Sequence, residues 1–303
     1  MNRIFPFLVM IRWPNLLMTV VGVVAIWYYQ IYRFNHEQPI QVDFTGILLF
    51  SLALMLIMGA GYIVNDIFDV EIDRINKPLK NNIGKQYSVR EAWIGYSILN
   101  IVGTTISVYT AYIYHKIDLL LFLVMGISML YIYSKWLKQR APWGNILISV
   151  LCALVLWMPA FVEWELVKKN SLLLTNFLAC SVVGGLCMFM RELVKSQEDY
   201  AGDKLYNVST LPVSLGLEKV KKIVIQINLF TILIITIFLF YFPIQALAIL
   251  AIIFLLIFPL LVLHMIFTHK TLSLRYSMQS KILKLIMAAG MLILPWALSN
   301  FRT

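Results

Sequence analysis

The sequence predicts an all-α integral membrane protein, and three observations support this fold class. Of the 303 residues, 61% are hydrophobic and only 13% are charged. The hydrophobic residues form repeated runs of about 20, which is the length of helix that crosses a bilayer. Lys and Arg are concentrated in every second connection between these runs, as in chains that cross a membrane repeatedly. A chain this apolar is not expected to bind nucleic acid.

Nine apolar segments are predicted to cross the membrane. They lie near residues 15–32, 45–66, 92–113, 117–134, 145–162, 172–190, 222–242, 245–267 and 282–299. The first segment is too long for a signal peptide and has no small-residue cleavage site, so we expect it to stay as a helix. Nine crossings leave little chain for a soluble part. We therefore expect a single transmembrane domain over residues 1–303.

The basic residues predict the orientation of the chain. Twenty of the 25 Lys and Arg fall on the side of the N-terminus, and such residues accumulate on the cytoplasmic side. The N-terminus is thus expected inside and the C-terminus outside. Nearly all of the net charge of +10 lies on the cytoplasmic face, where it favours contact with anionic membrane lipids. With no transit peptide in view, a prokaryotic plasma membrane is the expected location.

Acidic residues gather where the second span ends, in the stretch Gly61 to Pro78. Carboxylates crowded on one helix face repel one another unless cations lie among them. A helix end that only faces solvent would instead spread its acids around the helix axis. Among the acids of this stretch, Glu71 alone points away from the shared face. On an ideal helix, four polar residues share an arc of about 100°: Asn65, Asp66, Asp69 and Asp73.

A second acidic group follows the sixth span, in the stretch Met188 to Gly216. Its polar residues again share one helix face: Glu192, Ser196, Asp199 and Asp203. Both groups close an even-numbered span, so both are expected on the cytoplasmic side, facing each other across a cavity. Oxygen ligands of this kind suit Mg2+. Two opposed sets suit a diphosphate bridged by metal ions, which neutralise the charge on a leaving group.

Several cations near these groups have no obvious acidic partner. They can bind phosphate, although cytoplasmic loops collect Lys and Arg for topology alone. Their combination with the acidic groups favours phosphate binding. The cations are Arg12, Arg74, Lys77, Lys80, Lys135, Lys138 and Arg140.

Together these motifs resemble the UbiA superfamily of intramembrane prenyltransferases, over essentially the whole chain. The first motif has the form NDxxDxxxD, followed by INKP at Ile75 to Pro78. The second contains DxxxD, with TLPVSLG at Thr210 to Gly216. IRWPNLL, at Ile11 to Leu17, is similar to the first-helix signature of the family. That similarity implies that Arg12 and Asn15 lie at the mouth of the cavity.

The segment after the fourth span, YSKWLKQRAPWGN, is similar to a part of the family that carries a functional Tyr and Lys. We assign these roles to Tyr133 and Lys138, with Tyr131 and Lys135 as a competing pair at helical spacing. The chain also departs from the family. Relatives have Asp where it has Ser196, and commonly Gly where it has Asn207. Glu192 lies one helical turn before Ser196, on the face where it would replace the missing carboxylate.

The resemblance implies Mg2+-dependent transfer of a prenyl group from an isoprenyl diphosphate to a small acceptor. It assigns catalytic roles to Asp66, Asp69, Asp199, Tyr133 and Lys138. It assigns substrate binding to Arg12, Asn15, Lys77, Lys80 and Arg140. The implied metal ligands are Asn65, Asp66, Asp69, Asp73, Asp199, Asp203 and Glu192.

The acceptor stays open at this stage. The second motif is similar to the branch of geranylgeranylglyceryl phosphate transferases, which favours a phosphorylated glycerol or a small phenol. Aromatic acceptors of quinone biosynthesis, namely 4-hydroxybenzoate, homogentisate or a naphthoate, are the alternative. A non-catalytic isoprenoid-binding protein and a terpene cyclase on the same fold are further alternatives. A secondary transporter fits less well, because transporters place polar residues at mid-membrane on broken helices.

Overall fold

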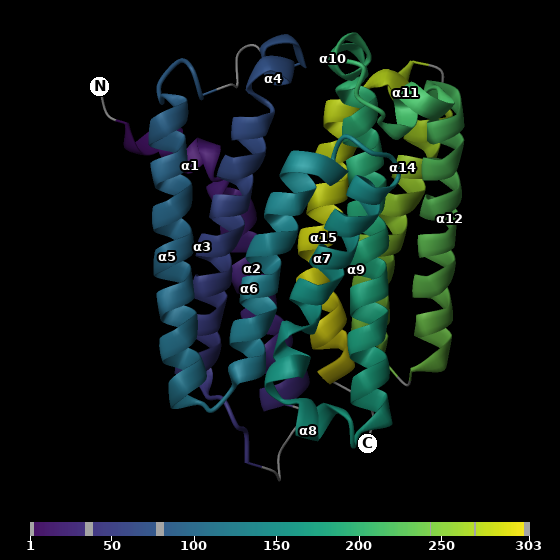
Figure 1. Ribbon diagram of the computed structural model, residues 1–303. Helices are drawn as coiled ribbons and strands as arrows, with labels where there is room; N and C mark the ends of the chain where they lie inside the picture. Colours follow the sequence, from purple (N-terminus) through teal and green to yellow (C-terminus); the bar gives the residue numbers. More distant parts are fainter. Residues whose placement is uncertain (1–2, 34–38, 77–81, 243, 270, 300–303) are drawn as a thin grey trace.

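A computed structural model of the chain describes residues 3–33, 39–76, 82–242, 244–269 and 271–299. These residues form a bundle of long, roughly parallel helices (Figure 1). In this part of the chain, eight helical segments are long and apolar enough to cross a membrane. They are α2 (Trp13–Ile26) with the π-helical turn η1 (Trp27–Tyr32), α3 (Phe44–Phe68), α6 (Ile117–Ile132) with η2 (Tyr133–Leu137), α7 (Trp143–Val162), α9 (Ser171–Glu198), α12 (Leu217–Tyr241), α13 (Ala246–Ile252) continued by η3 (Ile253–Ile257) and α14 (Phe258–Thr268), and α15 (Tyr276–Ser299).

The span predicted near 92–113 forms α5 (Val89–Ile113), which packs along α3. This helix is 25 residues long but is not among the eight whose composition alone marks them as spans. The start of α2 and the end of α15 lie at opposite ends of the bundle (Figure 1). The chain therefore crosses the bundle an odd number of times, and α5 provides the ninth crossing that the sequence predicts.

The outer surface of the bundle is apolar, as expected for an integral membrane protein. Large side chains such as Tyr112, Phe240 and Met265 are exposed, Phe240 to 88%. Such surface is stable against lipid chains and unfavourable in water. Inside the bundle, α9 contributes to both of the larger hydrophobic clusters: Phe177 packs with residues of α2, α3 and α7, and Met190 with residues of α12 to α15. The central position of α9 fixes where its polar end lies.

Short helices lie beyond the long ones. At one end of the bundle are α4 and α10, and at the opposite end is α8 (Figure 1). Three of them, α4, α8 and α10, each follow a long helix after a break or a turn in the backbone. The bounds of the short helices are α1 (Ile4–Met10), α4 (Val70–Asn76), α8 (Trp164–Val167), α10 (Tyr200–Leu205), α11 (Leu211–Leu215) and the 3-10 turn η4 (Leu272–Leu274).

Both acidic motifs straddle the junction between a long helix and a short one. Asp69 ends α3 with φ −95° and ψ 1°, and α4 follows. Asp199 ends α9 with φ −87° and ψ 2°, and α10 follows. The sequence analysis treated each motif as one ideal helix, and this is wrong at the two junctions. Because both junctions have the same arrangement, Asp73 and Asp203 still line the same cavity as the two junction aspartates.

Asn207 follows α10 with φ 54°, in the left-handed region. Glycine adopts this conformation without strain, and Asn tolerates it better than most residues. The residue that departs from the family pattern thus keeps the turn that a glycine would form. Further along this loop, the Ser209 carbonyl accepts a hydrogen bond from the Ala141 N–H at 2.7 Å. This bond joins the loop after α10 to the loop before α7.

Gly144, in the first turn of α7, lies against the backbone that carries Lys138. An added Cβ would come within 2.6 Å of the Leu137 carbonyl oxygen and 2.8 Å of the Lys138 Cα. We expect Gly144→Ala to lower the free energy of unfolding by about 1–3 kcal/mol, because backbone atoms cannot move aside as a flexible side chain would. The measurement is unfolding in detergent micelles.

Gly185→Ala in α9 is the matched control. The nearest atoms to its added Cβ lie at 3.5 and 3.6 Å, an ordinary contact, and alanine is the better helix former. This variant is expected to be as stable as the parent chain or slightly more so. Equal stability of the two variants would contradict the close approach of α7 to the Lys138 backbone.

Candidate active site

A cavity of about 260 Å³ lies among α2, α3, α6, α7, α9 and α15. It brings together residues of both acidic motifs, although more than 100 positions of sequence separate them. The motif residues that line it are Asn65, Asp69, Asp73, Glu192, Ser196, Asp199 and Asp203. The predicted opposition of the two motifs across one cavity therefore matches the structure.

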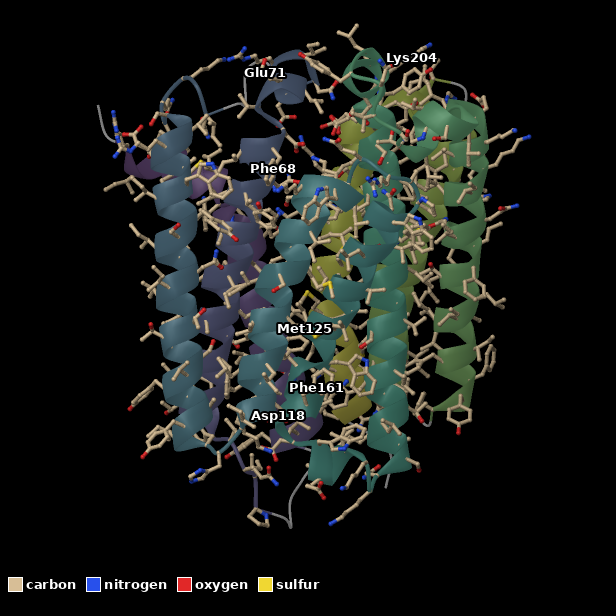
Figure 2. The ribbon with its side chains drawn as sticks, viewed as in Figure 1. Phe68, Glu71, Asp118, Met125, Phe161 and Lys204 are labelled. Carbon is tan, nitrogen blue, oxygen red and sulfur yellow. The ribbon has the colours of Figure 1, made fainter. Side chains whose placement is uncertain are left out.

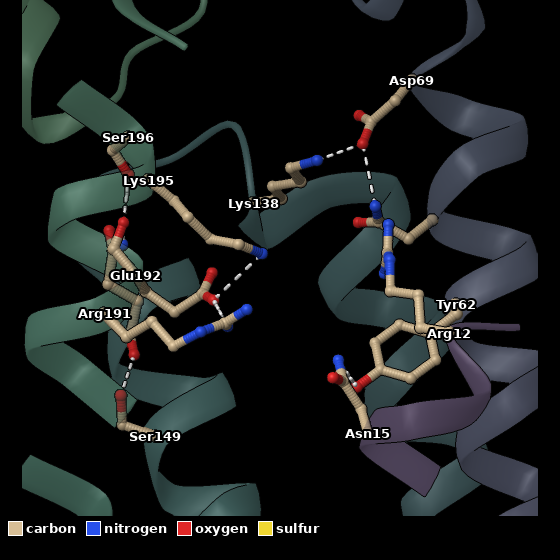
Figure 3. Close-up of polar contacts among 12 residues, drawn as sticks. Arg12, Asn15, Tyr62, Asp69, Lys138, Ser149, Arg191, Glu192, Lys195 and Ser196 are labelled. Atoms are coloured by element: carbon tan, nitrogen blue, oxygen red, sulfur yellow. Dashed lines mark hydrogen bonds and ion pairs between the residues drawn. The ribbon is translucent and has the colours of Figure 1, made fainter. Parts of the chain in front are cut away.

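Asp69 is the buried acid at the end of α3. One of its oxygens accepts a hydrogen bond from the Asn65 amide at 2.9 Å and forms an ion pair with Lys138 (Figure 3). Burial alone would lower the pKa of Lys138, but the charge and the hydrogen bond of Asp69 outweigh it and raise that pKa. Lys138 is therefore a fixed positive charge in the cavity wall.

Arg12 and Asn15 enter the cavity from the start of α2. The Arg12 guanidinium contacts Asp66 at 2.7 Å and lies over the Tyr62 ring, 4.4 Å from its centroid. The Asn15 amide donates to the Tyr62 hydroxyl at 3.3 Å (Figure 3). Arg12 itself has φ 55° and ψ 48°, a left-handed conformation that is strained for arginine and that concentrates at functional sites. Asp66 pairs with Arg12 at the edge of the cavity and is not part of its lining.

On the opposite wall, α9 places Glu192 between two cations. Its carboxylate lies 3.3 Å from an Arg191 nitrogen and 3.6 Å from the Lys195 ammonium (Figure 3). Ser196 donates to the Glu192 carbonyl at 2.9 Å and accepts from the Asn145 amide at 3.4 Å. The role of Glu192 as a replacement metal ligand stays a prediction. Its contacts in the structure are with cations.

The short helices α4 and α10 hold the acidic ends of the two motifs together. The Gly202 N–H donates to the Asn76 side-chain oxygen at 2.9 Å. A Cβ at Gly202 would lie 2.4 Å from that oxygen, so only glycine permits this approach. Burial, together with the neighbouring charge of Asp199, raises the pKa of Asp203 to about 6. Because acids are crowded at this end of the cavity, bound cations stabilise their ionised forms.

The structure also separates the two candidate Tyr–Lys pairs. Tyr133 and Lys138 line the cavity, and Tyr133 lies in the π-helical turn η2, a feature common at functional sites. Tyr131 and Lys135 do not line it. Lys135 instead lies over the ring of Trp136, 4.7 Å from the centroid, on the exposed side.

Of the remaining predicted substrate-binding residues, the structure describes Arg140 alone. Arg140 is exposed and is not part of the lining. Its neighbour Ala141 pairs with the loop at Ser209 instead. Lys77 and Lys80 lie outside the described residues. Their roles in binding substrate stay predictions.

Sequence analysis missed several polar residues of the lining. Arg191 and Lys195 flank Glu192, and a cation inside an apolar span was a usable signal. Lys284 was counted only as a topological charge, although it lies two turns inside α15. Asn76 and Asn145 carried no signal, since single amides are common on helices. All five line the cavity.

The deeper part of the cavity is apolar. Its wall comes from α2, α3, α6, α7 and α15, which present Met, Leu and aromatic side chains. Met125 of α6, labelled in Figure 2, belongs to this wall and is 51% exposed. Such a wall accommodates a hydrocarbon chain and keeps water from it. The apolar residues include Met18, Met58, Phe122, Met125, Leu154 and Met291.

The donor set fits Mg2+ in one particular way. The Asn65 side-chain oxygen is buried and has no hydrogen-bond partner among the described residues, so it is available as a ligand. Within the same part of the chain, no three Asp, Glu, His or Cys side chains converge tightly enough to hold a metal alone. Mg2+ is commonly bound by one or two carboxylates together with phosphate oxygens of a substrate. The residues therefore fit a metal that is bound jointly with a diphosphate.

The fold and the site are those of an intramembrane protein whose cavity is polar at one end and apolar beyond it, a division that suits a lipid diphosphate. The family is established by comparison: this chain belongs to the UbiA prenyltransferase family, whose model matches residues 34–290.

Curated relatives of the chain are archaeal digeranylgeranylglyceryl phosphate synthases. The protein of Saccharolobus solfataricus is 34% identical, over 59% of this chain and 60% of its own length. That of Korarchaeum cryptofilum is 28% identical, over 77% and 75%. That of Methanocaldococcus jannaschii is 30% identical, over 71% and 69%. The first match thus spans three fifths of the relative.

Solved structures share the fold over nearly the whole chain. A structure described for digeranylgeranylglyceryl phosphate synthase in membranes has a TM-score of 0.66 at 24% identity, covering 98% of this chain and 99% of that one. A UbiA homologue from Archaeoglobus fulgidus, bound to GPP and Mg2+, has a TM-score of 0.55 at 18% identity, covering 95% and 99%. At these identities the likeness establishes the UbiA fold.

The buried pair of Asp69 and Lys138 gives a prediction about stability. Asp69→Asn and Lys138→Met each leave one buried charge without its partner, whereas the double variant removes both charges. We expect the free energy of unfolding of the double variant to exceed, by about 0.5–3 kcal/mol, the value obtained by adding the effects of the two single variants. The measurement is the free energy of unfolding in mixed micelles.

The exposed pair of Glu71 and Arg74, at 2.9 Å, provides the control cycle. Exposed pairs contribute about 0–1 kcal/mol because water screens them. If both cycles gave the same small coupling, Lys138 would not be held by Asp69 as the structure shows.

Proposed function

We propose that this protein transfers a prenyl group from an isoprenyl diphosphate to the hydroxyl group of a glycerol phosphate within the membrane, with Mg2+. One observation carries the proposal: two acidic helix junctions surround one end of a cavity whose deeper wall is apolar. An isoprenyl diphosphate has the same division, with an anionic head and a hydrocarbon tail. The head would lie between the acidic motifs with Mg2+, and the tail along the apolar wall.

The acidic residues would hold Mg2+ and the diphosphate together. The proposed ligands are Asn65, Asp69 and Asp73 from the first motif, and Asp199 and Asp203 from the second. When bound, Mg2+ neutralises the charge that develops on the diphosphate as it leaves. Asp66 acts on this site by holding Arg12, which it contacts. Glu192 stands as a further predicted ligand.

Lys138, Arg12 and Tyr133 would act on the reacting groups. Lys138 and Arg12 place positive charge near the diphosphate, where charge-assisted hydrogen bonds are strong. Tyr133 lies in the same wall and would face the allylic carbon after the bond to oxygen breaks. The cation so formed must meet the acceptor before it meets water, which the apolar wall excludes.

The proposed reaction exchanges one carbon–oxygen bond for another. The bond between the allylic carbon and the diphosphate oxygen breaks, and its electron pair stays on the diphosphate. The acceptor hydroxyl oxygen forms an ether bond to that carbon. The hydroxyl proton leaves to the diphosphate or to water, so atoms and charge balance without an oxidant or a reductant.

The acceptor is proposed from the relatives. Curated proteins similar to this chain are named for a digeranylgeranylglyceryl phosphate product. The name describes a glyceryl phosphate carrying two geranylgeranyl groups, so the donor would be geranylgeranyl diphosphate and the acceptor geranylgeranylglyceryl phosphate. The second acidic motif, similar to this branch, supports the same choice over an aromatic acceptor.

We further propose that the acidic end of the bundle faces the cytoplasm of a prokaryotic cell. The connections between α3 and α5, α6 and α7, and α9 and α12 lie at this end (Figure 1). With the adjoining helix ends, the segments 74–90, 135–140 and 191–222 hold 14 of the 25 Lys and Arg. The bias of Lys and Arg toward the cytoplasm supports the assignment. Mg2+ would then enter from the cytoplasm and the released diphosphate would leave to it, whereas both lipid substrates would enter from the bilayer.

The central prediction is loss of transfer when either acidic motif is changed. Asp69→Asn and Asp199→Asn should each lower kcat at least about 100-fold, because each removes a carboxylate that neutralises the departing diphosphate. EDTA should abolish the activity, and Mg2+ should restore it. The assay measures ether product by mass spectrometry and diphosphate release, in nanodiscs, with geranylgeranyl diphosphate and a panel of glycerol phosphate and phenolic acceptors.

Neighbouring acids provide matched controls. Glu71 and Glu198 are exposed and lie within two residues of Asp69 and Asp199, outside the cavity lining. Glu71→Gln and Glu198→Gln should keep the parental activity. Transfer to phenols alone would overturn the acceptor assignment. Donor binding without release of diphosphate, with any acceptor, would favour an isoprenoid-binding protein, and release without acceptor would favour a cyclase.

A further inference from the structure

We propose that Arg191, Lys195 and Lys284 form a separate binding site for the phosphate group of the acceptor. This inference rests on the proposed function, because it assigns the residues that recognise the acceptor. The donor diphosphate is assigned to the acidic helix junctions. The three cations line the same cavity from α9 and α15, and no step of the donor chemistry uses them.

Two of these cations, Arg191 and Lys284, keep N–H donors without a hydrogen-bond partner among the described residues. Arg191 and Lys195 share one carboxylate, that of Glu192, which orients them toward the cavity (Figure 3). The Arg191 Nε is buried and has no hydrogen-bond partner among the described residues. Lys284 lies within electrostatic range of Arg191. Over the same residues, no hydrogen bond or ion pair of Lys284 is seen.

The charges match those of a phosphomonoester. Three cations and one carboxylate leave two positive charges in this part of the cavity. A phosphomonoester carries close to two negative charges at neutral pH, since its second pKa is about 6. Arginine suits phosphate through paired N–H donors, and lysine adds a point charge. The alternative aromatic acceptors, such as 4-hydroxybenzoate, carry a single carboxylate charge and would leave one positive charge unmatched, so the group favours a phosphorylated acceptor.

The spacing also fits an acceptor held beside the donor. Arg191 precedes Asp199 by two helical turns, about 12 Å along the axis of α9, and Lys195 lies halfway between them. The glycerol hydroxyl that reacts is on the carbon next to the one that carries the phosphate. A phosphate held deeper than the acidic junction would thus keep its hydroxyl near the allylic carbon, while the two anionic groups stay apart.

Lys284→Met and Arg191→Gln test this site in steady-state kinetics. Each should raise the KM for the phosphorylated acceptor at least about tenfold, the loss expected for one charge-assisted hydrogen bond. The KM for the donor diphosphate should change by less than about twofold. The parent protein should prefer the phosphorylated acceptor to the corresponding alcohol. Each variant should lower this preference by the same factor by which it raises the KM for the phosphorylated acceptor.

Lys281→Met is the matched control on α15. Lys281 lies one turn before Lys284 but is exposed and outside the cavity lining, so both KM values should stay as in the parent protein. A second readout avoids turnover altogether. Binding of geranylgeranylglyceryl phosphate to the protein in nanodiscs, without donor and without Mg2+, should weaken in Lys284→Met and stay unchanged in Lys281→Met.

The outcomes separate this inference from the proposed function. A rise in donor KM with unchanged acceptor KM would assign the cations to the diphosphate and overturn the inference. Parental kinetics and binding in both variants would overturn it as well. If the parent protein prenylates only phenols, the proposed function fails first, before any variant is made. If the parent protein prenylates glycerol phosphates and both variants keep its kinetics and binding, the proposed function stands and only this acceptor site is ruled out.

Discussion

Repulsion between carboxylates at two helix junctions is the constraint on which the rest of the site depends. Asp69 and Asp199 each end a long helix beside the same cavity, and further acids follow in α4 and α10. Such a group is stable only when cations lie among its members. Arg12 and Lys138 supply part of that charge, and both come from segments distant in sequence. A bound Mg2+–diphosphate would supply the remainder.

Ser196 lies where the resemblance to the family predicts an acid, and a serine there has a physical consequence in this arrangement. Ser196 lies between the acidic junction at Asp199 and the ion pairs of Glu192. An aspartate at this position would extend the negative charge toward Arg191 and Lys195. With serine, the cavity side of α9 carries no acid between Glu192 and Asp199. The cavity then offers one place suited to a metal-bound diphosphate and another suited to a phosphate without metal.

Sequence patterns predicted the parts of this structure that local chemistry determines. Apolar runs fixed the spans because the bilayer allows only hydrogen-bonded helices, and helix periodicity placed Asp69 and Asp199 on inward faces. Periodicity could not predict that the helix breaks at those residues, since this depends on the packing of α4 against α10. It also could not place Lys284, or exclude Arg140, because these depend on which helices meet around the cavity.

The most direct test of the account is the affinity of the site for a metal ion with and without diphosphate. Mn2+ can replace Mg2+ as a paramagnetic probe, and its binding to the protein in nanodiscs can be titrated by EPR in the presence of an unreactive geranylgeranyl thiodiphosphate. Because the acidic residues do not form a complete metal site alone, we expect the analogue to tighten Mn2+ binding at least about tenfold. Equal affinity with and without the analogue would contradict a site completed by the substrate.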